Sequence, residues 1–137
     1  MIIKKFNQLN PDILSKQFPF FTLIVGKKSS DMFDYFGVEE MHGLKKSECY
    51  DKPGDCYIAG FCNVYPDDSS KHYLFLNSFR FNKTYLDYLL IMHECSHLSL
   101  EKHGRNLEDG QVEEDMVTWS EETAIEIIEF LKSNGIL

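Results

Sequence analysis

The sequence contains no apolar run long enough to cross a membrane. The N-terminal segment also lacks the apolar region of a signal peptide, because Asn7, Gln8 and Asn10 interrupt it. Positive charge is scarce as well: 14 Lys and Arg face 22 Asp and Glu, which gives a net charge of -8. An acidic surface repels the phosphates of nucleic acids and anionic membranes. We therefore expect a cytoplasmic protein with neither a nucleic-acid partner nor a membrane partner.

The sequence also lacks a C-x-x-C pair, although it has four cysteines: Cys49, Cys56, Cys62 and Cys95. Their spacing fits neither a zinc knuckle nor a redox dithiol. Disulfides remain the alternative for a secreted chain, but no signal peptide supports it. There is no internal repeat. At 137 residues the chain has the length of one domain with its own core, so we expect a single domain over residues 1–137.

Apolar periodicity and turn residues predict an α+β fold with a small, mostly antiparallel sheet beside two core helices. Strands are expected at 20–25, 56–65 and 72–79, the last two as antiparallel neighbours. Helices are expected at 10–18, 30–37, 84–103 and 112–135. Residues 41–55 are expected to form turns, since Pro53 and Gly54 are strong loop signals.

The segment "HECSH" places His93 and His97 four residues apart on the predicted helix 84–103, in the pattern H-E-x-x-H. Residues at this spacing are neighbours on a helix, so two imidazoles can bind one zinc ion. Glu94 is then placed to act as the general base toward a zinc-activated water. Both histidines continue an apolar stripe, and we expect that stripe to face the core. It comprises Leu86, Leu89, Leu90 and Leu100.

The sequence offers three candidates for the third zinc ligand. His103 has the spacing of the metzincins, but Leu100 replaces the glycine at which their helix turns, so the helix should carry His103 away from the metal. Glu113 and Glu121 both fall on or beside the apolar stripe of the terminal helix. Glu113 lies in the first turn, where the helix dipole favours a carboxylate. Glu121 lies mid-helix, where the dipole does not explain a carboxylate on an apolar stripe but a metal ion would. We therefore favour Glu121 and keep the other two as alternatives.

These residues resemble the ImmA/IrrE-type metallo-endopeptidases, a group of gluzincins. The resemblance covers roughly residues 57–131 and rests on "YLFLNS", "HECSHLSL" and a downstream E-x-x-A segment. The family's last zinc ligand is the glutamate of that segment, which corresponds to Glu121 here. The residues that match the apolar positions after it are Ala124, Ile127, Ile128 and Leu131. Cys95 and Ser96 stand where the family usually has Leu-Gly.

The resemblance implies a zincin-like fold and zinc-dependent hydrolysis of a peptide bond in a protein substrate, with a regulatory protein as the expected partner. Strand 72–79 is expected to form the edge of the cleft and to bind an extended peptide. Two alternatives stay open at this point. One is a non-catalytic binding module that keeps the zincin scaffold; the other is a domain in which His93 and His97 are core histidines without a metal. Cys95 is expected to be a buried structural thiol.

Overall fold

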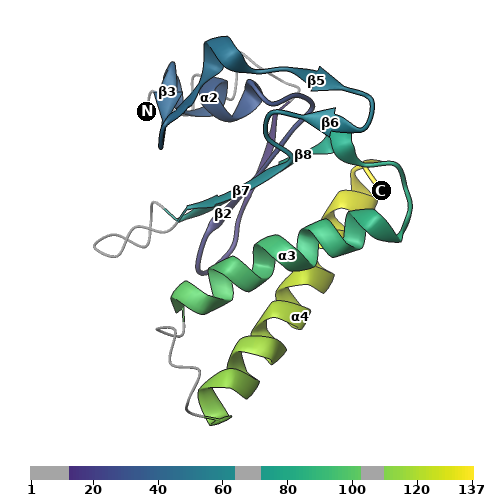
Figure 1. Ribbon diagram of the computed structural model, residues 1–137. Helices are drawn as coiled ribbons and strands as arrows, with labels where there is room; N and C mark the ends of the chain where they lie inside the picture. Colours follow the sequence, from purple (N-terminus) through teal and green to yellow (C-terminus); the bar gives the residue numbers. More distant parts are fainter. Residues whose placement is uncertain (1–12, 64–71, 103–109) are drawn as a thin grey trace.

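A computed structural model describes residues 13–63, 72–102 and 110–137 of the chain (Figure 1). The four-stranded sheet consists of β1 (Leu14–Gln17), β2 (Thr22–Gly26), β7 (Gly60–Asn63) and β8 (Tyr73–Asn77). Two short hairpins are formed by β3 (Glu40–Met41) with β4 (Leu44–Lys45) and by β5 (Asp51–Lys52) with β6 (Asp55–Cys56). The helices are α2 (Asp31–Phe36), α3 (Tyr85–Lys102) and α4 (Gly110–Ser133), with 3-10 turns η1 (Lys46–Glu48) and η3 (Ser78–Arg80).

The sheet has the strand order β1-β2-β8-β7, with antiparallel pairs at both ends and a parallel β2–β8 pair in the middle. This confirms an α+β fold with a small, mostly antiparallel sheet. It also confirms that the strands on either side of residues 64–71 are antiparallel neighbours, with Gly60 opposite Leu76 and Cys62 opposite Leu74.

The central strands β2 and β8 are buried on both faces. Leu23 and Leu76 face a core shared with α3 and α4, whereas Ile24 and Phe75 face a second core on the α2 side. Figure 1 shows the two long helices on one side of the sheet and α2 with the hairpins on the other. A strand covered on both faces needs apolar residues at successive positions, which explains the uninterrupted runs "LIV" and "YLFL".

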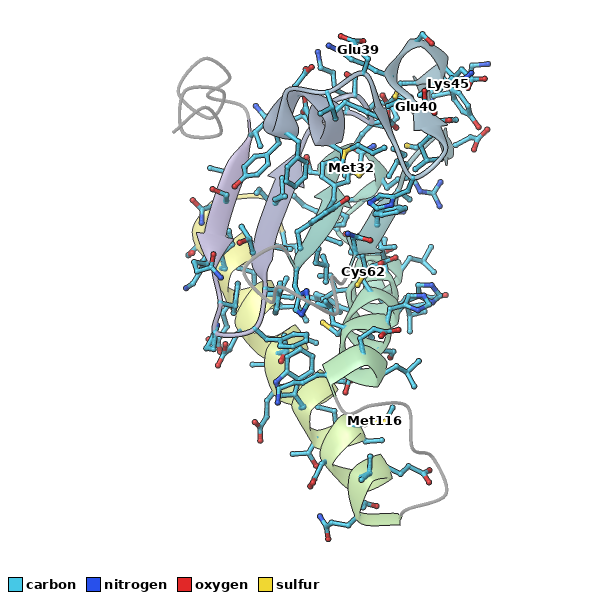
Figure 2. All side chains as sticks on the ribbon, turned by 90° about the vertical axis from the view of Figure 1, so that its left-hand side faces the viewer. Met32, Glu39, Glu40, Lys45, Cys62 and Met116 are labelled. Carbon is cyan, nitrogen blue, oxygen red and sulfur yellow. The ribbon has the colours of Figure 1, made fainter. Side chains whose placement is uncertain are left out.

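Figure 2 shows sulfur-containing side chains on both sides of the sheet. Met32 of α2 lies above the sheet and is fully buried there, while Cys62 of β7 lies on the side of α3. Met116 lies on the part of α4 that extends beyond the sheet (Figure 2). Among the described residues, no helix combines the length and the apolar character needed to cross a membrane.

The predicted N-terminal helix 10–18 is wrong where the structure describes it. Residues Leu14–Gln17 form β1, which pairs with β2 so that Leu14 lies opposite Val25. Pairing with the sheet overrides the local helix signal, which came from Asn10 and Pro11, two residues outside the described ranges. The predicted edge position of strand 72–79 is also wrong, because β8 lies between β2 and β7. The edge strand beside α3 is β7.

Candidate metal centre

Helix α3 turns a different face to the core from the one the apolar stripe predicted. Ile91, Cys95 and Leu98 are fully buried under the sheet, whereas Leu86 and Leu89 are 52% and 58% exposed. The helix carries two apolar stripes, and periodicity alone does not say which one meets the sheet. The expectation that the histidine stripe faces the core is therefore wrong, while the buried position expected for the Cys95 thiol is confirmed.

His93 and His97 lie on the exposed side of α3, and their Nε2 atoms are 3.2 Å apart. Two imidazole nitrogens bound to one tetrahedral zinc ion lie about 3.3 Å apart, because each is roughly 2.0–2.1 Å from the metal. A hydrogen bond between two neutral imidazoles, in which one ring donates its N–H to the lone pair of the other, gives a similar distance, so the same arrangement suits the metal-free pair. The exposure of both rings excludes the alternative that they are core histidines.

The carboxylate of Glu94 is the buried member of the motif. Glu94 is only 6% exposed and packs against the backbone of β7. A Cβ atom added to Gly60 would lie 3.1 Å from Oε1 of Glu94, so the absence of a side chain at Gly60 makes room for the carboxylate. Burial raises the pKa of Glu94, and the charge of His93 opposes this shift. No hydrogen bond is formed by Glu94 within the described residues.

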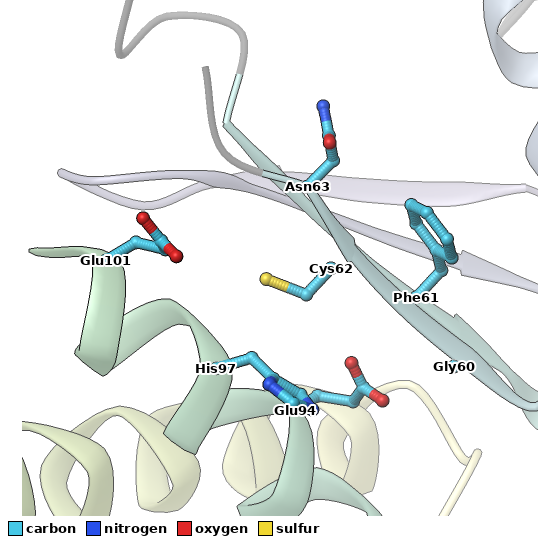
Figure 3. Close-up of a pocket in the computed structure, with 7 residues that line it drawn as sticks. All are labelled: Gly60, Phe61, Cys62, Asn63, Glu94, His97 and Glu101. Atoms are coloured by element: carbon cyan, nitrogen blue, oxygen red, sulfur yellow. The ribbon is translucent and has the colours of Figure 1, made fainter. Parts of the chain in front are cut away.

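A cavity of about 420 Å³ separates β7 from α3 and contains this carboxylate (Figure 3). Its walls are formed by Gly60, Phe61, Cys62, Asn63, Glu94, His97 and Glu101. Burial, with smaller contributions from the neighbouring Glu94 and Cys95, raises the pKa of the Cys62 thiol to about 12. Cys62 is therefore a neutral thiol in the wall of the cavity.

Among the residues that the structure describes, no third ligand lies beside the histidine pair. Within the described ranges, no group of three or more His, Cys, Asp or Glu side chains is arranged to hold a metal ion. The candidate His103 lies outside the described residues. Glu113 and Glu121 both lie on α4, and both are exposed.

The packing of α4 against α3 nevertheless places the two glutamates at different distances from the histidines along the helix pair. The hydroxyl of Ser99 donates to the carbonyl of Met116 at 2.8 Å, which fixes the register of the two antiparallel helices. Glu121 lies five residues after Met116 and is therefore level with the motif, five residues before Ser99. Glu113 lies three residues before Met116, level with the end of α3 and about 7.5 Å beyond His97 along the helix axis.

Glu121 also lies on the appropriate side of α4. The Trp119 ring packs under the sheet against Phe20 and Phe21. Two residues along an α-helix correspond to a rotation of about 200°, so Glu121 points away from the sheet. The histidines point to that same side of α3, opposite the buried Ile91 and Leu98.

A partly buried hydrogen-bond network holds the segment that leads into β7. Asp51 accepts hydrogen bonds from the backbone N–H of Ser29 at 3.0 Å, from the Ser29 hydroxyl at 2.8 Å and from Asn77 Nδ2 at 2.9 Å. Asn77 Nδ2 also donates to the carbonyl of Ile58, whose N–H donates to Ser29 Oγ. The network thus joins the ends of β2 and β8 to the residues just before Gly60, which faces Glu94.

Sequence reasoning missed the β7 wall of the cavity, together with Glu101. One signal was present: a glycine inside a strand, such as Gly60, often marks a close approach by another group. Comparisons of the chain with known protein families, with curated proteins and with solved structures gave no match.

Proposed function

We propose that the protein is a zinc-dependent hydrolase of peptide bonds, with His93 and His97 as zinc ligands and Glu94 as the general base. The observation that carries the proposal is the arrangement of two exposed imidazoles, 3.2 Å apart, beside a buried carboxylate in the wall of an open cavity. Zinc sites of catalytic type use three protein ligands and leave one position for water. The chain's resemblance to the gluzincins points to the same chemistry.

Glu121 is the third ligand in this proposal. Its support is its level along α4 beside the motif and its position on the same side of the helix pair as the histidines. An exposed glutamate can change rotamer at little cost, so a metal ion can recruit its carboxylate after the histidines have bound. His103 and Glu113 remain the alternatives that the experiments below distinguish.

The chemical role of Glu94 follows from its surroundings. A bound zinc ion supplies an electrophile for the carbonyl oxygen and lowers the pKa of a coordinated water. Glu94 accepts the proton of the attacking water as the oxygen adds to the carbonyl carbon, and it then delivers that proton to the leaving amine as the C–N bond breaks. Because burial raises its pKa, Glu94 is a better proton acceptor at this position than a solvated carboxylate.

The edge strand β7 is the proposed docking site for the substrate backbone. β7 pairs with β8 on one side, and no strand of the described residues pairs with it on the other. An extended peptide can add to such an edge through main-chain hydrogen bonds, while its side chains enter the cavity above α3. The substrate is accordingly a protein or peptide with an accessible extended segment. We propose a cytoplasmic regulatory protein, in line with the family resemblance.

The test is cleavage of a proteome-derived peptide library by the zinc-loaded protein, read by mass spectrometry. The wild type should generate new termini, and Glu94→Gln should lower the rate by a factor of about 10² or more while it retains zinc. Glu122→Gln, an exposed glutamate of α4, is the matched control and should behave as the wild type. A zinc-loaded wild type that binds library peptides but cleaves none would instead support the non-catalytic binding module.

A further inference from the structure

An exposed apolar surface lies on the side of α3 and α4 that faces away from the sheet. Leu89 and Ile125 are 58% and 56% exposed. Each lies two residues before a fully buried isoleucine of its own helix, Ile91 or Ile127. Two residues along a helix correspond to a rotation of about 200°, so both exposed side chains point away from the core. This surface, the outer face, comprises Tyr85, Leu86, Leu89 and Ile125.

The packing of the two helices brings the parts of the outer face together. The hydrogen bond from Ser99 to the carbonyl of Met116 sets the register of the antiparallel pair (Figure 1). Leu89 lies ten residues before Ser99, and Ile125 lies nine residues after Met116. The two side chains are therefore nearly level along the pair, and they belong to one continuous apolar surface.

Glutamates border the outer face along α4. On the surface of a helix, the neighbours of a residue stand three and four positions away in either direction. For Ile125 these neighbours are Glu121, Glu122, Ile128 and Glu129. Within the described residues, none of the three glutamates forms an ion pair. The outer face is thus apolar on α3 and acidic along its border on α4.

This pattern fits an amphipathic, basic helix of a partner protein. Apolar side chains spaced three and four residues apart on such a helix can pack on Leu86, Leu89 and Ile125. Lys or Arg on its flank can then pair with Glu122 and Glu129. A second copy of the chain fits less well, because a two-fold contact through this face would bring the same glutamates close together.

The edge of the outer face already holds a cation against an aromatic ring. Nζ of Lys132 on α4 lies 5.7 Å from the ring centroid of Tyr88 on α3. Such contacts are favourable, and Arg forms them more often than Lys. The ring of Tyr85 is 72% exposed, so a basic side chain of a partner can make the same kind of contact there.

We infer that the outer face binds the amphipathic, basic helix of a partner protein. This inference goes beyond the proposed hydrolysis and does not depend on a bound metal. His93 follows Leu89 by four residues on the same helix, so the outer face borders the histidine pair. A partner bound there would lie beside the candidate metal centre.

The probe is a synthetic helical peptide with leucines three and four residues apart and lysines on both flanks, titrated against the full chain. The wild type should bind it, and added salt should weaken the binding. Leu89→Ser and Ile125→Ser should each weaken binding about tenfold, because each removes an apolar contact from the interface. Val117→Ser is the matched control, since Val117 is 51% exposed on α4 but lies eight residues before Ile125. An equal loss in this control overturns the inference.

Charge reversal tests the acidic border. The double variant Glu122→Lys/Glu129→Lys should bind the peptide about tenfold more weakly and with little salt dependence. Glu114→Lys/Asp115→Lys changes the net charge by the same amount at exposed positions near the start of α4, and it should bind like the wild type. Equal weakening in both double variants would reduce the effect to net charge and overturn the inference, as would equal binding of a peptide with glutamate in place of lysine.

Two further measurements locate the bound peptide and identify the occupant. Amide chemical shifts of the isotope-labelled protein should change mainly at residues 85–93 and 121–129; changes confined to β1 or β7, or no binding at all, overturn the inference. Sedimentation without the peptide should show a monomer, whereas a dimer that Leu89→Ser dissociates would assign the outer face to a second copy. The metal-free protein is used and no bond is cut, so failure here leaves the proposed hydrolysis intact.

Discussion

The network around Asp51 should control the stability of the whole β7 wall, and Asp51→Ala tests this most sharply. The backbone N–H of Ser29 donates to both Asp51 oxygens at 3.0 Å and has no other acceptor within the described residues. The Ser29 hydroxyl and Asn77 Nδ2 retain the carbonyl of Ile58 as a second acceptor, at 3.3 Å and 2.8 Å. Alanine therefore leaves one buried N–H without a partner and removes two charge-assisted bonds.

The expected cost follows from these contacts. An unsatisfied buried donor costs about 1–3 kcal/mol, and each charge-assisted bond contributes on the order of 1 kcal/mol where a second acceptor remains. Asp51→Ala should therefore lower the free energy of unfolding by about 3–5 kcal/mol, which corresponds to a fall in Tm of about 10–15 °C for a chain of this size. Asp51→Asn retains one acceptor oxygen but turns an amide N–H₂ toward Ser29, so about half of that loss is expected.

Urea denaturation of the three proteins measures these differences, with Glu48→Ala as an exposed control that should change stability by less than about 0.5 kcal/mol. The pH dependence gives a second readout. Burial alone raises the pKa of Asp51, but the hydrogen bonds from Ser29 and Asn77 outweigh burial and hold the pKa below 3.8. Its contribution is present above pH 3.8 and is lost as the pH falls below that value, and this loss should vanish in Asp51→Ala. A loss below about 1 kcal/mol would refute the reasoning.

Three further predictions concern the two cores. Leu98→Ala should lower the free energy of unfolding by about 2–5 kcal/mol, whereas Leu89→Ala on the exposed stripe should lower it by less than about 0.5 kcal/mol. Equal losses of stability in urea denaturation would contradict the face of α3 that is assigned to the core. Burial raises the pKa of Asp31 above 3.8, so the folded state retains its proton more tightly and stability declines as the pH rises from 3.8. Asp31→Asn should remove that decline. The same dependence of unfolding free energy on pH in the wild type and in the variant would contradict this prediction. Cys95 is fully buried, and burial raises its pKa to about 12, so iodoacetamide should leave it unmodified until the protein unfolds. Peptide mass spectrometry measures the labelling, and rapid modification of the native protein would contradict this prediction.

The elements that carry a clear local signal could be predicted from the sequence. The strand at β2, the helix α2 that ends at Gly37 and the two long helices follow from apolar periodicity and from turn residues. β1 could not be predicted, because residues Leu14–Gln17 become a strand only through their pairing with β2. The position of β8 inside the sheet likewise depends on its parallel pairing with β2, which lies about fifty residues away in the sequence.

The candidate site, too, could be predicted from the sequence only in part. The spacing of His93 and His97 places both on one side of a helix in any fold, and their proximity in the structure follows from that spacing. The direction in which that side points could not be predicted, because α3 has two apolar stripes and the sheet covers the one with Ile91 and Leu98. Glu101 was missed because it lines the cavity together with β7, and β7 lies beside α3 only in the tertiary fold.

The central claim is that His93 and His97 bind zinc together with Glu121. Zinc content per chain and zinc affinity, measured by elemental analysis and chelator competition, test it directly in the wild type and in five variants: His93→Ala, His97→Ala, Glu121→Gln, Glu113→Gln and His103→Ala. Both histidines are exposed, so their variants should fold, as circular dichroism can verify. We predict one zinc ion per wild-type chain, a loss of affinity of about 100-fold or more in the first three variants, and wild-type binding in the last two. Wild-type zinc affinity in His93→Ala and His97→Ala would contradict the account.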